Sequence, residues 1–283
     1  MTNLQKITPF VLCTDNGIEV AKFYANIFPE AKILSENNFV TEIEIFGTKI
    51  STLNAWEYAK NILNPSISFS LWITDENLTK QIWDQLSDGW SLMMDFDKYS
   101  RSAWYWRCND KYGVSRQVMY DNRPDRKSAL VPSMMFIGNN NDKTQEAVDY
   151  YTDIFDDSNI DFVWKYEAWE NDIQWNISHA EFKLANQQFI AMDSSADHKF
   201  NFSDWISLMI SCDDQEEVDK FWDKFVNDGW AESQCGRCKD KYWVSRQVVP
   251  VQLMAAISDP TNWQKAMQNM MKMKKIIIAD LSN

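Results

Sequence analysis

The side chains best suited to acid–base or metal chemistry lie in one strand-like segment of this sequence. His179 and Glu181 are two residues apart in an alternating segment, so both point to the same face of a strand. An imidazole beside a carboxylate can share a proton or take part in binding a metal ion. Glu42 corresponds to Glu181 in an earlier segment, where no histidine matches His179. The alternative interpretation is a solvated strand face that happens to carry a histidine.

Two glutamines occur in a segment that the chain contains twice. Residues 109–118 (NDKYGVSRQV) return as 239–248 (KDKYWVSRQV), which indicates a tandem duplication. Each copy predicts a polar turn and then a strand with Val and Arg on one face and Ser and Gln on the other. Gln117 and Gln247 are therefore either buried polar groups or ordinary strand residues that bond to neighbouring backbone.

Cys235 and Cys238 have the two-residue spacing of zinc and redox motifs. No second pair of this kind and no nearby pair of histidines completes a set of four zinc ligands. Five cysteines, an odd number in a chain of 283 residues, are typical of reduced thiols rather than of a disulfide framework. The first residues lack the apolar core of a secretory signal, and no segment holds about 18 uninterrupted apolar residues. We therefore expect a cytoplasmic protein.

The elements that must position these residues follow one pattern several times. A short apolar strand, a helix with one apolar face and further strands begin near Ile7 and again near Ile67. After the polar, proline-containing segment 123–129 the pattern restarts near Val131. The sequence thus predicts an α+β fold in which each half of the chain contains two β-α-β-β-β units. The predicted division is a first domain at 1–122, a linker at 123–129 and a second domain at 130–283.

The second domain has an addition that the first lacks. Residues 258–260 (SDP) predict a helix start. Beyond it an apolar stripe follows, which is expected to close a core or a domain interface and which consists of Trp263, Met267, Met270 and Met271.

The bulk composition excludes some classes of partner. A net charge of −13 and a pI near 4.6 argue against binding to nucleic acid or to anionic membranes. A protein surface that binds either of them needs clustered Lys and Arg. A hydrophobic fraction of 45% is ample for two cores. The expected partner is a small-molecule ligand.

Taken together, these segments resemble the PhnB-like proteins of the vicinal oxygen chelate (glyoxalase/bleomycin resistance/dioxygenase) superfamily. Such relatives often carry the description 3-demethylubiquinone-9 3-methyltransferase. The resemblance covers almost the whole chain, is closer in the second half, and rests on ITPF at 7–10, AEFKL at 180–184, QCG at 234–236, KDKY at 239–242, VSRQVVP at 244–250 and SDP at 258–260. It implies a tandem duplication of glyoxalase-like domains, packed either as a monomeric pseudo-dimer or as a homodimer.

The resemblance also implies where a metal would bind. Enzymes of the superfamily hold a divalent metal in a cup formed by two units, using His, Gln and Glu, so that the metal can act as a Lewis acid on neighbouring substrate oxygens. The position usually given to a metal-binding glutamate is occupied by Gln117 and Gln247, so the carboxylate is missing in both cups. The other expected ligand positions hold Phe, Leu, Met or Ser, which bind divalent metals poorly. We expect no cofactor, and metal-dependent catalysis is not carried over.

The methyltransferase description has no support in the residues. A common S-adenosylmethionine-binding fold would show a glycine-rich loop after a first parallel strand. This chain has seven glycines and no such loop.

The aromatic residues predict a cavity instead. Fourteen tryptophans exceed the ordinary need of two small cores, and Trp72, Trp106 and Trp205 lie on or beside predicted strands, where alternate positions would line a cup. Core packing is the alternative for each of them.

Three functional hypotheses follow. The leading one is binding of a small apolar or aromatic molecule in a metal-free cup. The alternative is a metal-dependent lyase, isomerase or dioxygenase with Gln247, Glu181 and His179 near the chemistry. A structural or interaction module is favoured if side chains fill both cups.

Overall fold

The computed structural model describes residues 5–55, 64–87, 92–99, 102–227 and 231–281. Within them the chain forms the predicted strand–helix–strand units in tandem. Unit 1 contains β1 (Ile7–Cys13), α1 (Gly17–Ile27), β2 (Lys32–Glu36), β3 (Val40–Ile45) and β4 (Thr48–Asn54). Unit 2 contains β5 (Ile67–Ile73), α2 (Glu76–Leu86), β6 (Leu92–Tyr99), β7 (Ser102–Asn109) and β8 (Ser115–Tyr120).

The second half of the chain repeats this order, except that unit 4 has two strands after its helix in the described residues instead of the predicted three. Unit 3 contains β9 (Ala129–Ile137), α3 (Thr144–Ile154), β10 (Asn159–Lys165), β11 (Ile177–Leu184) and β12 (Gln187–Ser194). Unit 4 contains β13 (Ile206–Cys212), α4 (Gln215–Val226), β14 (Arg237–Lys239) and β15 (Ser245–Pro250). It is followed by α5 (Val251–Ser258) and α6 (Trp263–Met270). Of the helices in the described ranges, none combines the length and the apolar character that crossing a membrane requires.

The sheets join units from different halves of the chain. Sheet A has seven strands in the order β14-β15-β13-β1-β4-β3-β2, so it combines units 4 and 1. Sheet B has eight strands in the order β10-β11-β12-β9-β5-β8-β7-β6, so it combines units 3 and 2. The two units of each sheet meet through an antiparallel pair of strands. In sheet A, β1 pairs with β13, with Phe10 opposite Ser207, and in sheet B, β5 pairs with β9, with Ser68 opposite Ser133. The duplication therefore supplies both units of each sheet within one chain.

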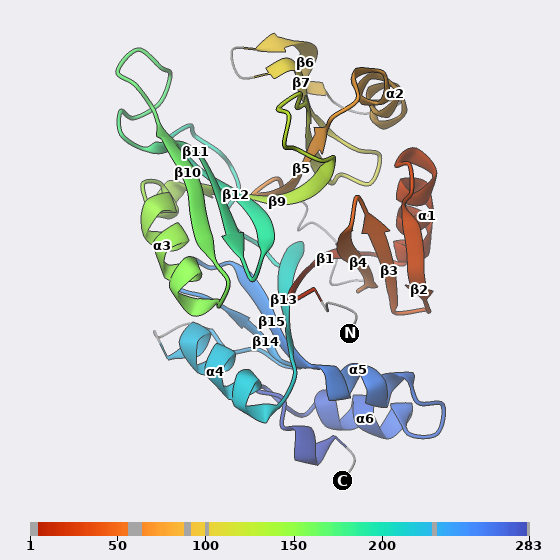
Figure 1. The fold of residues 1–283 in the computed structure, drawn as a ribbon. Helices are drawn as coiled ribbons and strands as arrows, with labels where there is room; N and C mark the ends of the chain where they lie inside the picture. The colour runs from red at the N-terminus through yellow and green to blue at the C-terminus, as the bar shows by residue number, and fades with distance from the viewer. Residues whose placement is uncertain (1–4, 56–63, 88–91, 100–101, 228–230, 282–283) are drawn as a thin grey trace.

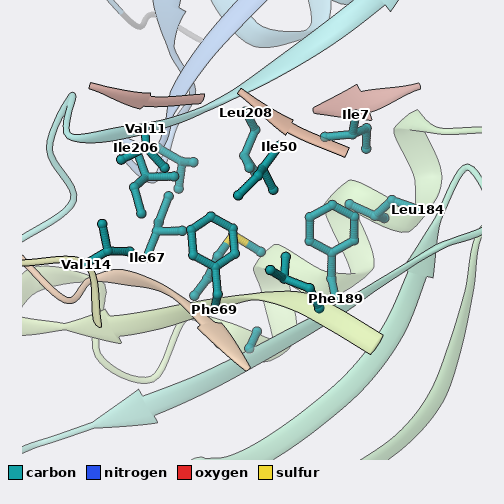
Figure 2. Close-up of a cluster of buried hydrophobic side chains, with 14 of the residues drawn as sticks. Ile7, Val11, Ile50, Ile67, Phe69, Val114, Leu184, Phe189, Ile206 and Leu208 are labelled. Carbon is teal, nitrogen blue, oxygen red and sulfur yellow. The ribbon is translucent and has the colours of Figure 1, made fainter. Parts of the chain in front are cut away.

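The two sheets pack back to back around one core. Figure 2 shows Ile7, Ile50 and Leu208 of sheet A pointing toward Phe69 and Phe189 of sheet B. The buried faces of α1 to α4 join the same cluster, with α1 and α2 on one side of the sheets and α3 and α4 on the other (Figure 1). We call the face of each sheet that is turned away from this core its cup face.

The repeated segment holds the two units of each half together. In the second half, the buried Asp240 carboxylate accepts hydrogen bonds from the Tyr151 hydroxyl of α3 at 2.9 Å and from Arg246 Nε at 2.9 Å. In the first half, Asp110 accepts from Tyr24 of α1 at 2.6 Å, and Arg116 Nε lies 3.4 Å from it. Removing one partner of such a buried pair costs about 3–5 kcal/mol. The Asp and Arg of the repeated segment thus have a structural role, because they connect the two units of each half.

The C-terminal segment covers the cup face of sheet A. Leu253 of α5, Ile276 and Leu281 are buried against Phe10 and Met209. Gly236 fixes the segment: its N–H donates to the Lys274 carbonyl at 2.7 Å, and at its φ of +73° a Cβ would lie 2.7 Å from the Val248 carbonyl oxygen. Figure 1 shows α5 and α6 packed below sheet A.

The predicted C-terminal helix is partly wrong. Residues 258–260 do not start the first helix after β15, because α5 begins directly after β15 at Val251 and ends at Ser258, and α6 starts only at Trp263. Asp259 accepts hydrogen bonds from the Thr261 N–H and the Asn262 side chain before α6 starts. Of the predicted stripe, Met270 packs against the cluster, whereas Trp263 and Met271 are exposed.

Candidate functional site

Gln117 lies on the cup face of sheet B. Arg116 and Val118 point into the shared core, so the alternation of β8 turns Gln117 the opposite way. Its side-chain Nε2 donates to Ser68 Oγ at 3.0 Å and to Ser133 Oγ at 3.4 Å, and its Oε1 accepts from the Tyr105 hydroxyl at 3.2 Å. Only 8% of Gln117 is exposed. Of the two interpretations, the buried glutamine is therefore correct, and its partners are side chains of the neighbouring strands.

Glu181 and His179 lie on the same cup face, on β11. His179 Nε2 is 3.4 Å from Glu181 Oε1, as the strand alternation predicts. Arg126 donates to Glu181 Oε2, and Arg123 Nη2 lies 3.6 Å from Oε1. Asp121 in turn accepts from Arg123 Nε at 2.8 Å. We call Asp121, Arg123, Arg126, His179 and Glu181 the ion-pair cluster.

The ion-pair cluster keeps its acids charged. Burial alone would raise the pKa of the Glu181 carboxyl, but hydrogen bonds from His179 and Arg126 outweigh it and hold this pKa below its ordinary value. Burial acts in the same sense on Asp121, and the hydrogen bonds and charge of Arg123 lower its pKa overall. Both carboxylates are therefore ionised and paired at neutral pH.

An apolar strip lies beside the cluster. Trp72, Val131 and Ile190 are buried on the cup face, with Met119, Ala129 and Met192 partly buried against them. The Arg126 guanidinium carbon is 4.4 Å from the centroid of the Trp72 ring, a cation–π distance. Arg126 thus contacts both Trp72 on β5 and Glu181 on β11, which is three strands away from β5 in sheet B.

The cup face of sheet A has a different content. Gln247 is 7% exposed, and its Nε2 donates to Ser207 Oγ at 2.7 Å. Glu42 on β3 is half-buried and accepts a hydrogen bond from the Ser35 hydroxyl at 3.3 Å. The hypothesis that placed Gln247 beside Glu181 and His179 is wrong, because the two sheets hold them apart.

Comparison with known proteins decides the family. A family model described as 3-demethylubiquinone-9 3-methyltransferase matches residues 5–119 and again residues 128–249. The chain belongs to this PhnB-like family. One match falls in each half of the chain, as the duplication predicts. No curated protein is similar enough to count as a match.

Solved structures provide a second comparison. The PhnB protein from Bacillus cereus is 31% identical over 42% of this chain and 95% of its own, with a TM-score of 0.38. Glyoxalase I from Zea mays matches 87% of this chain and 92% of its own at 10% identity, with a TM-score of 0.58. A Bacillus subtilis protein described as a dioxygenase matches 95% of this chain and 90% of its own at 8% identity, with a TM-score of 0.52. The last two show the vicinal oxygen chelate fold alone.

Two tryptophans predicted to line a cup of this PhnB-like chain lie elsewhere. Trp106 is fully buried in the shared core, 5.2 Å from Trp83 of α2 between ring centroids, because Tyr105 takes the cup side of β7. Trp205 precedes β13 and packs in the same core, where it lines a small cavity of about 80 Å³ with Val11 and Val114. Trp72 alone of the three lies on a cup face.

The cysteine pair of the PhnB-like chain is unsuited to redox work. All five cysteines are free, and burial raises the pKa of Cys238 to about 12 and also raises that of Cys235. A functional dithiol needs a thiolate near neutral pH. Within the described ranges, no group of three or more His, Cys, Asp or Glu is placed to hold a metal ion.

Several cup residues of sheet B escaped the sequence analysis. Arg123 and Arg126 belong to the segment 123–129, whose proline and polar composition predict a linker, and Asp121 lies just before it. Tyr105 was not predicted because its neighbour Trp106 was assigned to the cup instead. The one available signal was the alternation of acidic and basic residues from Asp121 to Arg126, directly after the last strand of the first half.

Proposed function

We propose that this PhnB-like chain is a cytosolic protein that binds a small apolar or aromatic molecule on the cup face of sheet B without a metal. The observation that carries the proposal is the apolar strip of Trp72, Val131 and Ile190 beside the buried Gln117 amide. Apolar walls with a few fixed polar groups are the usual composition of small-molecule sites. Five free cysteines support a reducing compartment.

Sheet B is the better candidate of the two. The cup face of sheet A is packed against α5 and the C-terminal residues, which leaves its Phe10 and Met209 buried. The cup face of sheet B has half-exposed members, including Met119, Met192 and His179. Sheet A thus has a cup face covered by the protein's own side chains, whereas the third hypothesis, a structural or interaction module, requires this of both cups.

The donor groups on sheet B do not fit a divalent metal. Glu181 is engaged by Arg126 and His179, and a metal would have to displace the arginine. Gln117 offers one neutral oxygen, which already accepts from Tyr105. The metal-dependent lyase, isomerase or dioxygenase thus remains the weaker hypothesis, and we derive no step through a metal. Methyl transfer is not carried over from the family description either, because both sheets mix parallel and antiparallel strands instead of forming an open parallel sheet.

Ligand-detected NMR tests the binding proposal. Indole and benzamide serve as neutral aromatic probes, and saturation transfer from the protein measures their binding. Met192→Trp places a bulky ring over the apolar strip, so we expect it to remove most of the transfer. Met271→Trp, at an exposed position of the C-terminal segment, is the control and should leave the transfer unchanged. Equal transfer in both variants contradicts the proposal, and so does an absence of transfer in the wild type for these probes and for benzoate alike.

Elemental analysis tests the metal alternative. Protein purified without chelator or affinity-tag metal is compared with the Gln117→Ala and Glu181→Ala variants. We expect metal near background in all three. Near-stoichiometric metal that either substitution removes would instead favour a Lewis-acid enzyme.

A further inference from the structure

Two arginines at corresponding positions of the duplication have side chains without an ion-pair partner among the described residues. The other arginines in the described part of the chain, Arg116, Arg123, Arg126 and Arg246, form ion pairs with carboxylates. Arg107 and Arg237 each lie two positions before the repeated segment, and the side chain of neither forms a hydrogen bond or an ion pair with a described residue. Arg107 lies opposite Gln117 in the β7–β8 register, and Arg237 lies opposite Gln247.

Arg107 lies where a charge is costly to leave unpaired. Its side chain is half-buried on the cup face of sheet B, and its Nε is buried without a hydrogen-bond acceptor. Burial lowers the pKa of this guanidinium, and among the side chains that the structure describes no carboxylate offsets the effect. A buried cation without a counter-charge is unfavourable, so the site is complete only when an anion is present.

A second unpaired donor belongs to the same corner of the cup face. Gln117 lies opposite Ser70 on β5, and Trp72 is the next residue of β5 on that face. Trp72 is 2% exposed, and its indole Nε1 has no hydrogen-bond partner. An unpaired cation, a neutral amide and an unpaired N–H thus lie on the same face of three adjacent strands, on Arg107 of β7, Gln117 of β8 and Trp72 of β5.

Arg237 differs from Arg107 in its surroundings. Asp204 supplies a nearby negative charge that favours the charged form of Arg237. Its cup face is also the one that α5 and the C-terminal residues cover. The unpaired arginine of sheet B is thus the one that is open to a ligand.

We infer that the ligand of sheet B is a small monocarboxylate with an apolar or aromatic body, whose carboxylate pairs with Arg107. This inference rests on the proposed function and names the class of its ligand. A guanidinium fork matches the two oxygens of a carboxylate. A single negative charge fits because Arg123 and Arg126 are already neutralised by Asp121 and Glu181. The chain's net charge of −13 also disfavours polyanions.

Matched pairs of probes test the charge requirement. Benzoate with benzamide, phenylacetate with phenylacetamide, and hexanoate with hexanamide differ in charge and hardly in shape. In the wild type each carboxylate should bind about ten-fold or more tightly than its amide, as a charge-assisted pair predicts. The preference should vanish in Arg107→Gln and persist in Arg237→Gln, the matched variant of the other sheet. Arg107→Lys keeps the charge and should retain part of the preference.

A direct readout does not depend on the variants folding. The ¹⁵Nε–¹H signal of Arg107 in the wild type should shift on addition of phenylacetate and stay in place with phenylacetamide. Carboxylates that bind without moving this signal, or amides that bind equally well, overturn the inference while the proposed function stands. If neither class of probe binds, the inference and the proposed function both fail.

Discussion

The two cup faces carry the same glutamine–serine hydrogen bond at corresponding positions, Gln247 to Ser207 in sheet A and Gln117 to Ser68 in sheet B. The side chains around this shared hydrogen bond differ between the two sheets. Sheet A buries Phe10 and Met209 beneath the C-terminal segment, whereas sheet B places an ion-pair cluster and Trp72 beside the amide.

The segment that follows the last strand of each half explains the difference. After β15 the chain continues directly into α5, whose Leu253 packs back onto sheet A. After β8 the chain continues through Asp121, Arg123 and Arg126, which pair with one another and with Glu181 of unit 3. The two halves thus share the same arrangement of strands. The short segments that follow the last strand cover sheet A with apolar side chains and add the ion-pair cluster to sheet B.

The largest effect on stability should come from the apolar residues of α5 that cover sheet A. Leu253→Ala removes a side chain that is buried in the cluster of sheet A, so we expect the free energy of unfolding to fall by about 2–5 kcal/mol. Met192→Ala on sheet B removes a partly buried side chain and should cost less than half as much. Urea unfolding measures both values. Equal losses would show that the two faces are covered alike.

The next largest effect on stability should come from the ion-pair cluster. Glu181→Gln leaves Arg126 without its strongest partner on β11 and should destabilise the fold by about 1–3 kcal/mol at pH 7. The corresponding residue of sheet A, Glu42, accepts one hydroxyl bond and is half-buried, so Glu42→Gln should change stability by less than about 0.5 kcal/mol. A larger cost for Glu42→Gln would reverse the assignment of the two faces.

The cost of Glu181→Gln should also depend on pH. The pKa of Glu181 is lower in the folded chain than its ordinary value of 4.5, so its contribution to stability is fully present above that value. It is lost as pH falls through the folded-state pKa. Unfolding curves for wild type and variant should therefore converge below about pH 4.5. A difference that grows with acidity would mean that Glu181 is protonated in the folded protein.

The units could be predicted from the sequence, but their pairing could not. Alternation within a strand tells which side chains share a face, as it did for Gln117 and for His179 with Glu181. It does not tell which strands are neighbours. The antiparallel joints of Phe10 with Ser207 and of Ser68 with Ser133 depend on how apolar faces of distant segments pack together.

The tryptophans illustrate a second limit. Trp106 and Tyr105 are adjacent, and one residue of register decides which of them lines the cup. Both are large and aromatic, so composition gives no preference. The arginines of the predicted linker were missed for a different reason, because their partner Glu181 is 55 residues away from Arg126 along the chain.

The smallest effect should come from the bond that both faces share. A double-mutant cycle of Gln117→Ala with Ser68→Ala, and another of Gln247→Ala with Ser207→Ala, isolate the amide–hydroxyl coupling in each sheet. We expect about 0.5–1.5 kcal/mol in both, the usual net value of a neutral buried hydrogen bond. Coupling confined to sheet B would mean that Gln117 is held for the ligand site alone. Equal coupling would assign the bond to the strand frame, so that only Arg107, Trp72 and the ion-pair cluster distinguish the binding face from the covered one.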